Sequence, residues 1–228
     1  MARRRPREID PNARNAGPKE MTLSSKVLIV DYGTGNLNSI KRILDRSKIH
    51  SIISSQAKDV LSADKIILPG VGHFGKAMAN LKQLDLVGAL NEVVMIRRKP
   101  VLGVCLGMQL MALRSQEGDA EGLGWLDAET VRFDISDRQR YKVPHVGWNQ
   151  VSIKKNSSLM SGVQDLSEFY FAHSYYLRMN DSSDVLNETK YETTFTSAIE
   201  KDNIFGVQYH PEKSHDVGVR LITNFAAI

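Results

Sequence analysis

Short apolar runs alternate with segments of helical periodicity through the first half of the chain. The runs have the length of buried strands and occupy residues 26–31, 50–54, 65–69 and 100–104. Helices are expected after them, over residues 37–46, 57–61, 76–84, 87–97 and from 106 onward. In the first helix, Leu37, Ile40 and Leu44 share one face. Four such alternations predict an α/β fold, with a mostly parallel central sheet flanked by helices.

The pattern changes after residue 117, where short β-rich segments follow one another with turn residues between them. These segments cover residues 129–134, 150–153, 168–172, 175–179, 192–195, 196–200 and 204–209. They predict antiparallel strands and hairpins added to the sheet in the C-terminal half, before a last helix over residues 216–225. Because the sequence has neither an internal repeat nor a domain linker, residues 26–228 are expected to form a single domain.

Residues 1–25 differ in composition from the rest of the chain. They are rich in arginine, proline, asparagine and glycine, with few apolar residues, and a second methionine, Met21, precedes the first strand. They predict a disordered basic leader, or an extension foreign to the natural protein. An arginine-rich tail that binds an acidic partner is the alternative. The segment supplies +3 of the net charge of +4, so the nearly neutral remainder gives no reason to expect a nucleic-acid partner.

The sequence also bounds where the protein works. It has no apolar run of about 18 residues, so no membrane partner is expected. The arginines near the start are not followed by the apolar segment of a secretory signal. A single cysteine excludes an intramolecular disulfide and suits a reducing compartment, so a cytoplasmic location is expected.

That cysteine, Cys105, lies at the join between a buried strand and a helix. Gly103 and Gly107 flank it symmetrically, which gives Gly-x-Cys-x-Gly, the thiol counterpart of the nucleophile elbow of serine hydrolases. The helix N-terminus behind it favours a thiolate and offers N–H groups to an oxyanion. A lone cysteine is more often a small buried apolar residue. The two glycines and the switch from strand to helix favour a nucleophile.

Two glycine-rich turns follow earlier strands. Residues 70–75 contain three glycines directly after a strand, which is typical of a loop that approaches a ligand closely, or of a tight connection. Residues 33–35 read Gly-Thr-Gly, but Asn38 stands where a dinucleotide-binding motif needs its third glycine. A dinucleotide site is therefore disfavoured.

Of the six histidines, His210 is the best candidate for a general base. It ends an apolar strand and is followed by Pro211 and Glu212. Proline favours an extended backbone, which would place the side chains of residues 210 and 212 on the same side. A carboxylate there can orient the imidazole and stabilise its protonated form. The sequence thus predicts a catalytic triad of Cys105, His210 and Glu212.

These motifs resemble those of the class I (triad) glutamine amidotransferases. The matching stretches are Gly-Val-Cys-Leu-Gly-Met-Gln at 103–109 and Gly-Val-Gln-Tyr-His-Pro-Glu-Lys-Ser at 206–214. The stretches at 144–150 and 171–176 narrow the resemblance to the glutaminase subunits of imidazole glycerol phosphate synthases. It extends over about 26–225. One departure is Trp125-Leu-Asp127, where this family commonly has a proline-glycine turn.

The resemblance implies roles for residues beyond the triad. Gly70, Val71, Gly72 and the N–H of Leu106 would form the oxyanion hole. Gln109, Ser174 and Tyr175 would hold glutamine. A further set would lie near the surface that binds the synthase subunit: Asn36, Pro144, His145, Gly147, Trp148, Asn149 and Lys213. No metal and no organic cofactor is implied.

The implied activity is hydrolysis of L-glutamine through a cysteine thioester, with ammonia passed to a separate (β/α)₈-barrel synthase subunit of histidine biosynthesis in a heterodimer. Three alternatives remain open. One is a paralogue that supplies ammonia to a synthase modifying surface-polysaccharide sugars. Another is an unrelated cysteine hydrolase, which usually has its acid before the histidine. The third is a scaffold without catalysis, which would be expected to have lost part of the triad.

Overall fold

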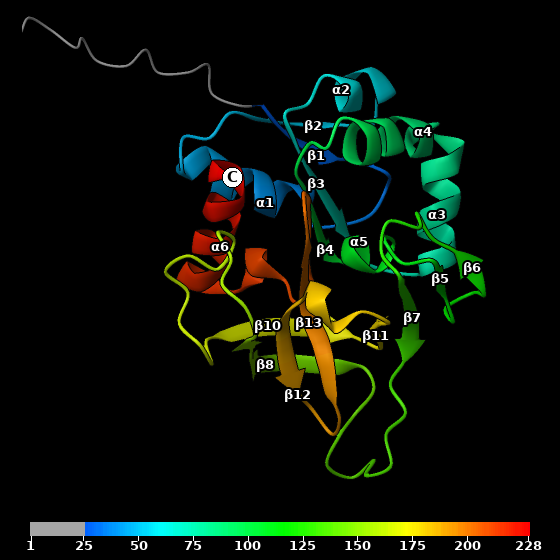
Figure 1. The fold of residues 1–228 in the computed structure, drawn as a ribbon, viewed down its shortest axis with the longest axis vertical. Helices are drawn as coiled ribbons and strands as arrows, with labels where there is room; N and C mark the ends of the chain where they lie inside the picture. The colour runs from blue at the N-terminus through cyan, green and yellow to red at the C-terminus, as the bar shows by residue number, and fades with distance from the viewer. Residues whose placement is uncertain (1–25) are drawn as a thin grey trace, which may run out of the picture.

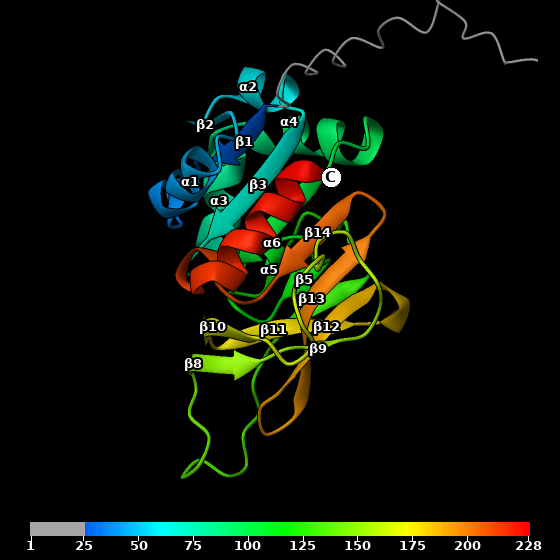
Figure 2. The same cartoon turned by 90° about the vertical axis from the view of Figure 1, so that its left-hand side faces the viewer.

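The computed structural model describes residues 26–228, so the prediction for residues 1–25 lies outside it. Five parallel strands form one half of its main sheet, in the order β2-β1-β3-β4-β14 with β2 at the edge (Figure 1 and Figure 2). Their bounds are β1 Val27–Val30, β2 Ser51–Ser54, β3 Lys65–Gly70, β4 Val101–Cys105 and β14 Ile204–Val207. The predicted α/β fold with a parallel sheet is confirmed.

Helices cover both faces of this sheet because its strands are apolar on both sides. Leu28 and Val30 of β1 pack towards one core, and Val27 and Ile29 towards the other. The first core is covered by α2 (Ala57–Leu61), α3 (Phe74–Gln83) and α4 (Leu86–Asn91), which continues as a π-helical turn over Glu92–Ile96. The second is covered by α1 (Leu37–Arg46) and α6 (His215–Ala227).

Further strands extend the sheet beyond β14, in the order β13, β11, β7, β5 and β6 (Figure 1 and Figure 2), and all of these pairings are antiparallel except that of β5 with β7. Their bounds are β13 Thr194–Lys201, β11 Tyr175–Met179, β7 Ala128–Arg132, β5 Arg114–Ser115 and β6 Ala120–Glu121. Strands β12 (Val185–Lys190) and β9 (Ser152–Ile153) branch from β13. A separate antiparallel pair joins β8 (His145–Gln150) to β10 (Glu168–His173). The predicted antiparallel additions are therefore confirmed.

Some predicted elements differ in extent. The helix expected from Leu106 onward ends after one turn, as α5 (Leu106–Gln109). The following carbonyl groups accept hydrogen bonds from a later segment instead, with Leu123 N–H donating to Leu110 O at 2.7 Å and Trp125 N–H to Met111 O at 2.9 Å. The segments 192–195 and 196–200 belong to one strand, β13, and β12 was not predicted.

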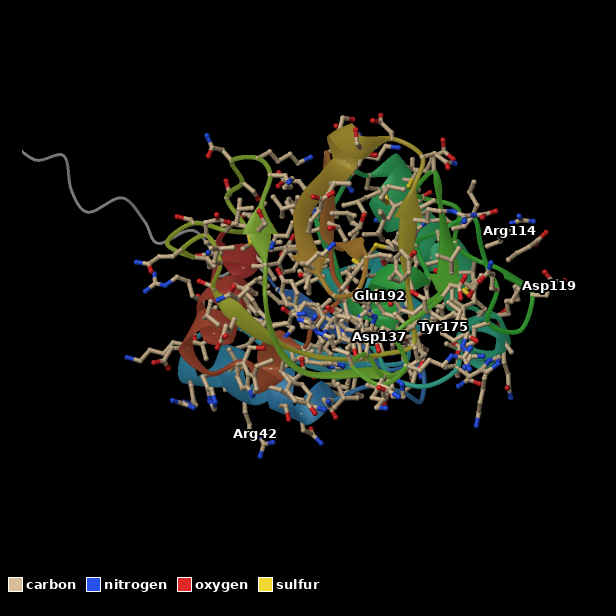
Figure 3. The ribbon with its side chains drawn as sticks, turned by 90° about the horizontal axis from the view of Figure 1, so that it is seen from below. Arg42, Arg114, Asp119, Asp137, Tyr175 and Glu192 are labelled. Atoms are coloured by element: carbon tan, nitrogen blue, oxygen red, sulfur yellow. The ribbon has the colours of Figure 1, made fainter. Side chains whose placement is uncertain are left out.

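The loop before β8 is tied to the turn between β12 and β13 by one carboxylate. Glu192 accepts hydrogen bonds from the backbone N–H groups of Ser136 and Asp137, at 2.9 and 2.7 Å, and from the Ser136 hydroxyl at 2.8 Å. Figure 3 shows Asp137 and Glu192 close together at this end of the molecule. Among residues 26–228, no helix has the length and apolar character needed to span a membrane.

Candidate active site

Cys105 occupies a strained turn between β4 and α5. Its backbone has φ +54° and ψ −111°, a region that costs a residue with a side chain about 1–3 kcal/mol. The flanking glycines are required by close packing. A Cβ at Gly103 would lie 2.6 Å from the Met108 nitrogen, and one at Gly107 would overlap the Leu68 carbonyl. The geometry is that of a nucleophile elbow, with a thiol at its tip.

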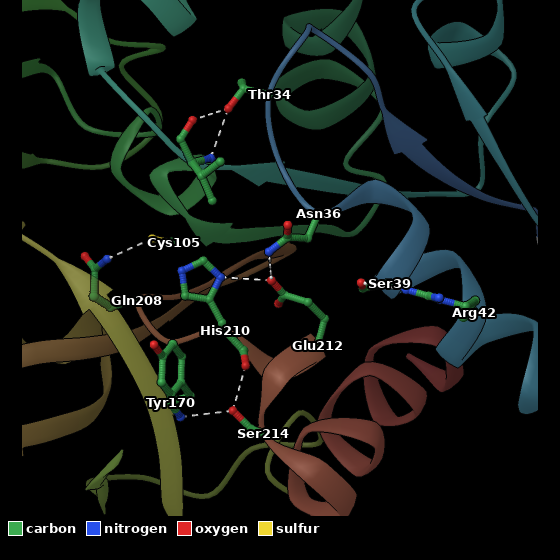
Figure 4. A network of polar contacts seen from close by, with 11 residues as sticks. Thr34, Asn36, Ser39, Arg42, Cys105, Tyr170, Gln208, His210, Glu212 and Ser214 are labelled. Carbon is green, nitrogen blue, oxygen red and sulfur yellow. Dashed lines mark hydrogen bonds and ion pairs between the residues drawn. The ribbon is translucent and has the colours of Figure 1, made fainter. Parts of the chain in front are cut away.

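The imidazole of His210 faces Glu212 across a short turn (Figure 4). His210 Nδ1 lies 2.9 Å from Glu212 Oε1, and both side chains are 2% exposed. The backbone differs from the prediction, because Pro211–Lys213 forms a 3-10 turn and not an extended segment. This turn, begun by Pro211, brings the carboxylate back to the ring. Asn36 Nδ2 donates to the same carboxylate oxygen at 2.9 Å.

The charges of these groups favour an ion pair at the site. Burial opposes protonation of His210, but the Cys105 thiolate and the Glu212 carboxylate outweigh it and raise the pKa of the imidazole. Burial likewise opposes ionisation of Glu212, but bonds from His210 and Asn36 outweigh it and lower the pKa of the carboxyl. The arrangement therefore supports a positively charged imidazolium beside the Cys105 sulfur, the setting in which a cysteine acts as a nucleophile.

The loop predicted to form the oxyanion hole is held by Thr34. The N–H of Val71 donates to the Thr34 hydroxyl oxygen at 3.0 Å, and that hydroxyl donates to the Val71 carbonyl. The Val71 N–H is thus committed to a side chain in this conformation. Gly72 has φ +109°, and Leu106 begins α5 directly after the thiol. Sequence reasoning missed Thr34, which it treated only as part of an incomplete dinucleotide motif.

The residues predicted to hold glutamine are linked to the thiol by amide side chains. Gln109 Nε2 donates to the Tyr175 carbonyl at 2.8 Å and to Gln208 Oε1 at 2.9 Å. Gln208 Nε2 in turn lies 3.6 Å from Cys105 Sγ. Ser174 lies at the bend between β10 and β11. Gln208 was missed by sequence reasoning, although a polar residue in the apolar run that ends at His210 is an available signal.

The residues predicted to face a partner lie in different environments. Pro144, Trp148 and Lys213 are exposed, Gly147 and Asn149 are half-buried, and the Trp148 ring stacks on His215. The His145 ring is buried, 3% exposed, and is turned inward. Asn36 is bonded to Glu212, as described above. The side chains of His145 and Asn36 therefore bond to other groups of this protein in this conformation.

The part of the chain that the structure describes offers no metal site. Within 26–228, no group of three or more histidine, cysteine, aspartate or glutamate side chains could hold a metal ion.

Trp125, in the stretch that departs from the family pattern, is buried and donates from Nε1 to Asn91 Oδ1 at 2.8 Å. That departure is accommodated in the core against α4, away from the triad.

Comparison with known proteins agrees with this geometry. Residues 28–227 match the family described as "Glutamine amidotransferase class-I". The chain is 46% identical over 202 residues to imidazole glycerol phosphate synthase subunit HisH 2 of Pseudomonas aeruginosa, covering 89% of this chain and 99% of the relative. It is 45% identical over 199 residues to the HisH 2 subunit of Methanococcus maripaludis, covering 87% and 98%.

Solved structures share the fold at much lower identity. PurLQS of Thermotoga maritima superposes with a TM-score of 0.67 at 15% identity, covering 89% of this chain and 98% of that one. The glutaminase domain of Trypanosoma brucei CTPS, solved with bound acivicin, gives 0.60 at 19% identity, covering 89% and 94%. With a family match over almost all described residues and close relatives of one kind, the chain belongs to the class-I glutamine amidotransferases and, within them, to the HisH subunits of imidazole glycerol phosphate synthase.

Proposed function

We propose that this chain hydrolyses L-glutamine to glutamate and ammonia, as the glutaminase subunit of an imidazole glycerol phosphate synthase of histidine biosynthesis. The observation that carries the proposal is the buried His210–Glu212 pair, 2.9 Å between Nδ1 and Oε1, beside a thiol on a nucleophile elbow. The relatives named as HisH subunits support the pathway. No observation favours the polysaccharide alternative.

The chemistry follows from the roles that these groups can take. The Cys105 thiolate attacks the side-chain carbonyl carbon of glutamine, and the carbonyl electrons move onto oxygen. His210 then gives its proton to the departing nitrogen, ammonia leaves, and a glutamyl thioester remains. The neutral imidazole next takes a proton from water, whose oxygen attacks the thioester. The tetrahedral intermediate then collapses, glutamate is released, and the Cys105 thiolate and the His210 imidazolium are regenerated.

The oxyanion formed in both steps needs donors at the carbonyl oxygen. Leu106 N–H and the loop at residues 70–72 are the proposed donors, but the Val71 N–H is bonded to Thr34. One missing donor costs about a hundred- to a thousandfold in rate. The described conformation therefore fits an enzyme with low activity until a partner favours rotation of the Val71 peptide.

The partner is proposed as a separate subunit with a (β/α)₈ barrel, joined in a heterodimer in the cytoplasm. Ammonia becomes mostly ammonium in neutral water, and ammonium is not a nucleophile. An enclosed route between the subunits would keep the product reactive. Exposed Trp148 and Lys213, together with Pro144, lie on the side of the molecule that carries β8 and the turn after His210, and they are the proposed contacts.

The test compares the chain with its Cys105→Ala variant, each mixed with the synthase subunit of the same organism. Glutamine-dependent synthesis should be lost in the variant, while synthesis from added ammonium salts should persist. The ammonium reaction is the control for the synthase subunit, and circular dichroism with co-elution of the two chains is the control for folding and assembly of the variant. Hydrolysis of glutamine by the variant at the parent's rate would contradict the proposal, as would a parent that releases no glutamate with the partner present.

A further inference from the structure

Two histidines outside the triad face each other in the small sheet. His145 in β8 and His173 in β10 form a register pair, and their side chains are 3% and 6% exposed. Aromatic rings surround them, with Phe195 centred 5.8 Å from the His145 ring and 5.2 Å from the His173 ring. Buried polar groups in such apolar surroundings require hydrogen-bond partners.

The hydrogen bonds of this pair have one consistent direction. His173 Nδ1 lies 2.8 Å from the Tyr175 carbonyl, which can only accept, so Nδ1 carries the proton. His173 Nε2 then accepts from His145 Nδ1 at 3.0 Å. His145 Nε2, left without a proton, accepts from Asn149 Nδ2 at 3.3 Å. Burial lowers the pKa of His145 to about 4 and that of His173 to about 3, so both rings are neutral at neutral pH.

The chain of hydrogen bonds continues from the Tyr175 carbonyl towards the Cys105 thiol. The Tyr175 carbonyl also accepts from Gln109 Nε2 at 2.8 Å, so both of its lone pairs are used. Gln109 donates its second hydrogen to Gln208, and Gln208 lies 3.6 Å from Cys105 Sγ. A displacement of the His173 ring would therefore shift a carbonyl that fixes the glutamine-binding amide.

The other end of the network lies in β8. Asn149 Nδ2 donates to the Lys190 carbonyl at 3.0 Å as well as to His145. On its opposite face β8 presents Val146 and Trp148, which are 57% and 45% exposed. One strand thus carries an apolar outer face and, on its inner face, the first members of a network that reaches the nucleophile.

We propose that His145 and His173 are positioning residues that relay the placement of β8 to Tyr175, Gln109 and Gln208. Docking of a partner on the outer face of β8 then sets how well the site binds glutamine. This inference rests on the proposed function, because it assumes glutamine hydrolysis and a synthase subunit on β8. It adds two residues that touch neither the substrate nor the thiol.

The test uses three variants in the complex with the synthase subunit. His145→Leu removes the donor to His173. His145→Asn keeps one, because the asparagine nitrogen takes the place of Nδ1. Phe195→Leu is the matched control, because it disturbs packing against both rings without touching the network. We expect His145→Leu to raise KM for glutamine roughly tenfold while kcat changes little, and His145→Asn to recover most of that loss.

The controls separate this relay from a structural role and from the proposed function. Circular dichroism and co-elution with the synthase subunit show that each variant is folded and assembled, because ammonium salts supply the synthase subunit directly. Equal effects of His145→Leu and Phe195→Leu, or no recovery in His145→Asn, would overturn the relay. If the relay fails these tests while the parent releases glutamate normally, the proposed function still stands. Nitrogen NMR of ¹⁵N-histidine-labelled parent should show both rings neutral and protonated at Nδ1, and an Nε2–H form of either would also overturn it.

Discussion

Asn36 Nδ2 donates to Glu212 Oε1 at 2.9 Å, joining two residues that lie 176 positions apart. Asn36 precedes α1, where asparagine side chains commonly cap a helix, yet its side chain makes no capping hydrogen bond. Its amide is used instead to hold the carboxylate that orients His210. The start of α1 therefore contributes a hydrogen bond to the proposed triad.

Replacing Asn36 with alanine should lower kcat/KM for glutamine about three- to tenfold, the scale of one hydrogen bond to a charged group. Because the Asn36 bond lowers the pKa of Glu212, its loss should also move the acidic limb of the pH–rate profile towards higher pH. Steady-state kinetics across pH measure both. Asn38→Ala, an exposed asparagine in the first turn of α1, is the matched control. Equal kinetics for the two variants would refute the role of Asn36.

Glu212→Gln should reduce glutaminase activity by a factor on the order of a hundred to ten thousand, as loss of a triad carboxylate does elsewhere. Without the carboxylate, the pKa of His210 falls, so the imidazole beside Cys105 carries less positive charge. Alkylation of Cys105 by iodoacetamide at pH 6 reports the thiolate directly, since the sequence has no second cysteine. Alkylation as fast as in the parent would show that Glu212 does not support the ion pair.

The parallel half of the fold could be predicted because its signals are local, and the residues of the proposed triad carry local signals as well. Cys105 with its two glycines, and His210 with Glu212, each stand within a few residues of one another. Strand β12 escaped prediction because it is covered on both sides, so that even Asn187 and Thr189 are buried and no alternation is visible.

The buried and exposed faces of strand β8 were hard to predict for a different reason. Its outer face carries Val146 and Trp148, while His145 and Asn149 point inward, the reverse of the ordinary pattern. The expectation that His145 lies near the partner surface came from the resemblance, and the structure buries its ring against His173. Thr34 and Gln208 have partners 37 and 103 positions away, at Val71 and Cys105, so these contacts could not be read from the sequence, although a polar Gln208 in an apolar run is a local signal.

Thr34→Val should raise the glutaminase activity of the isolated chain, because the Val71 N–H loses its acceptor and can turn towards the oxyanion position. The activity with the partner should change little, so the stimulation factor should shrink by about tenfold or more. Thr34→Ser keeps the hydroxyl and is the control. Glutamate release is measured with and without the synthase subunit. A basal rate no higher in Thr34→Val than in Thr34→Ser would exclude Thr34 as a restraint on the loop.

The free energy of unfolding should fall as the pH is lowered from about 6.5 to about 4, where an unfolded histidine binds a proton that a buried one does not. Burial lowers the pKa of His145 to about 4 and of His173 to about 3. Across this range the unfolded chain holds more protons than the native chain, which costs about 1.4 kcal/mol per pH unit for each ring. His210 adds no slope there, because its raised pKa leaves it charged in both states below about 6.5.

Urea unfolding at pH 7, 6 and 5 measures this slope in the parent. His145→Asn should make it shallower by about half, since one of the two rings is gone. His50→Asn, a change at an exposed histidine, is the control, and its slope should equal that of the parent. A slope that stays the same in His145→Asn would mean that the His145 ring gains its proton without breaking its bond to His173, and the neutral, directed pair described for β8 and β10 would then be wrong.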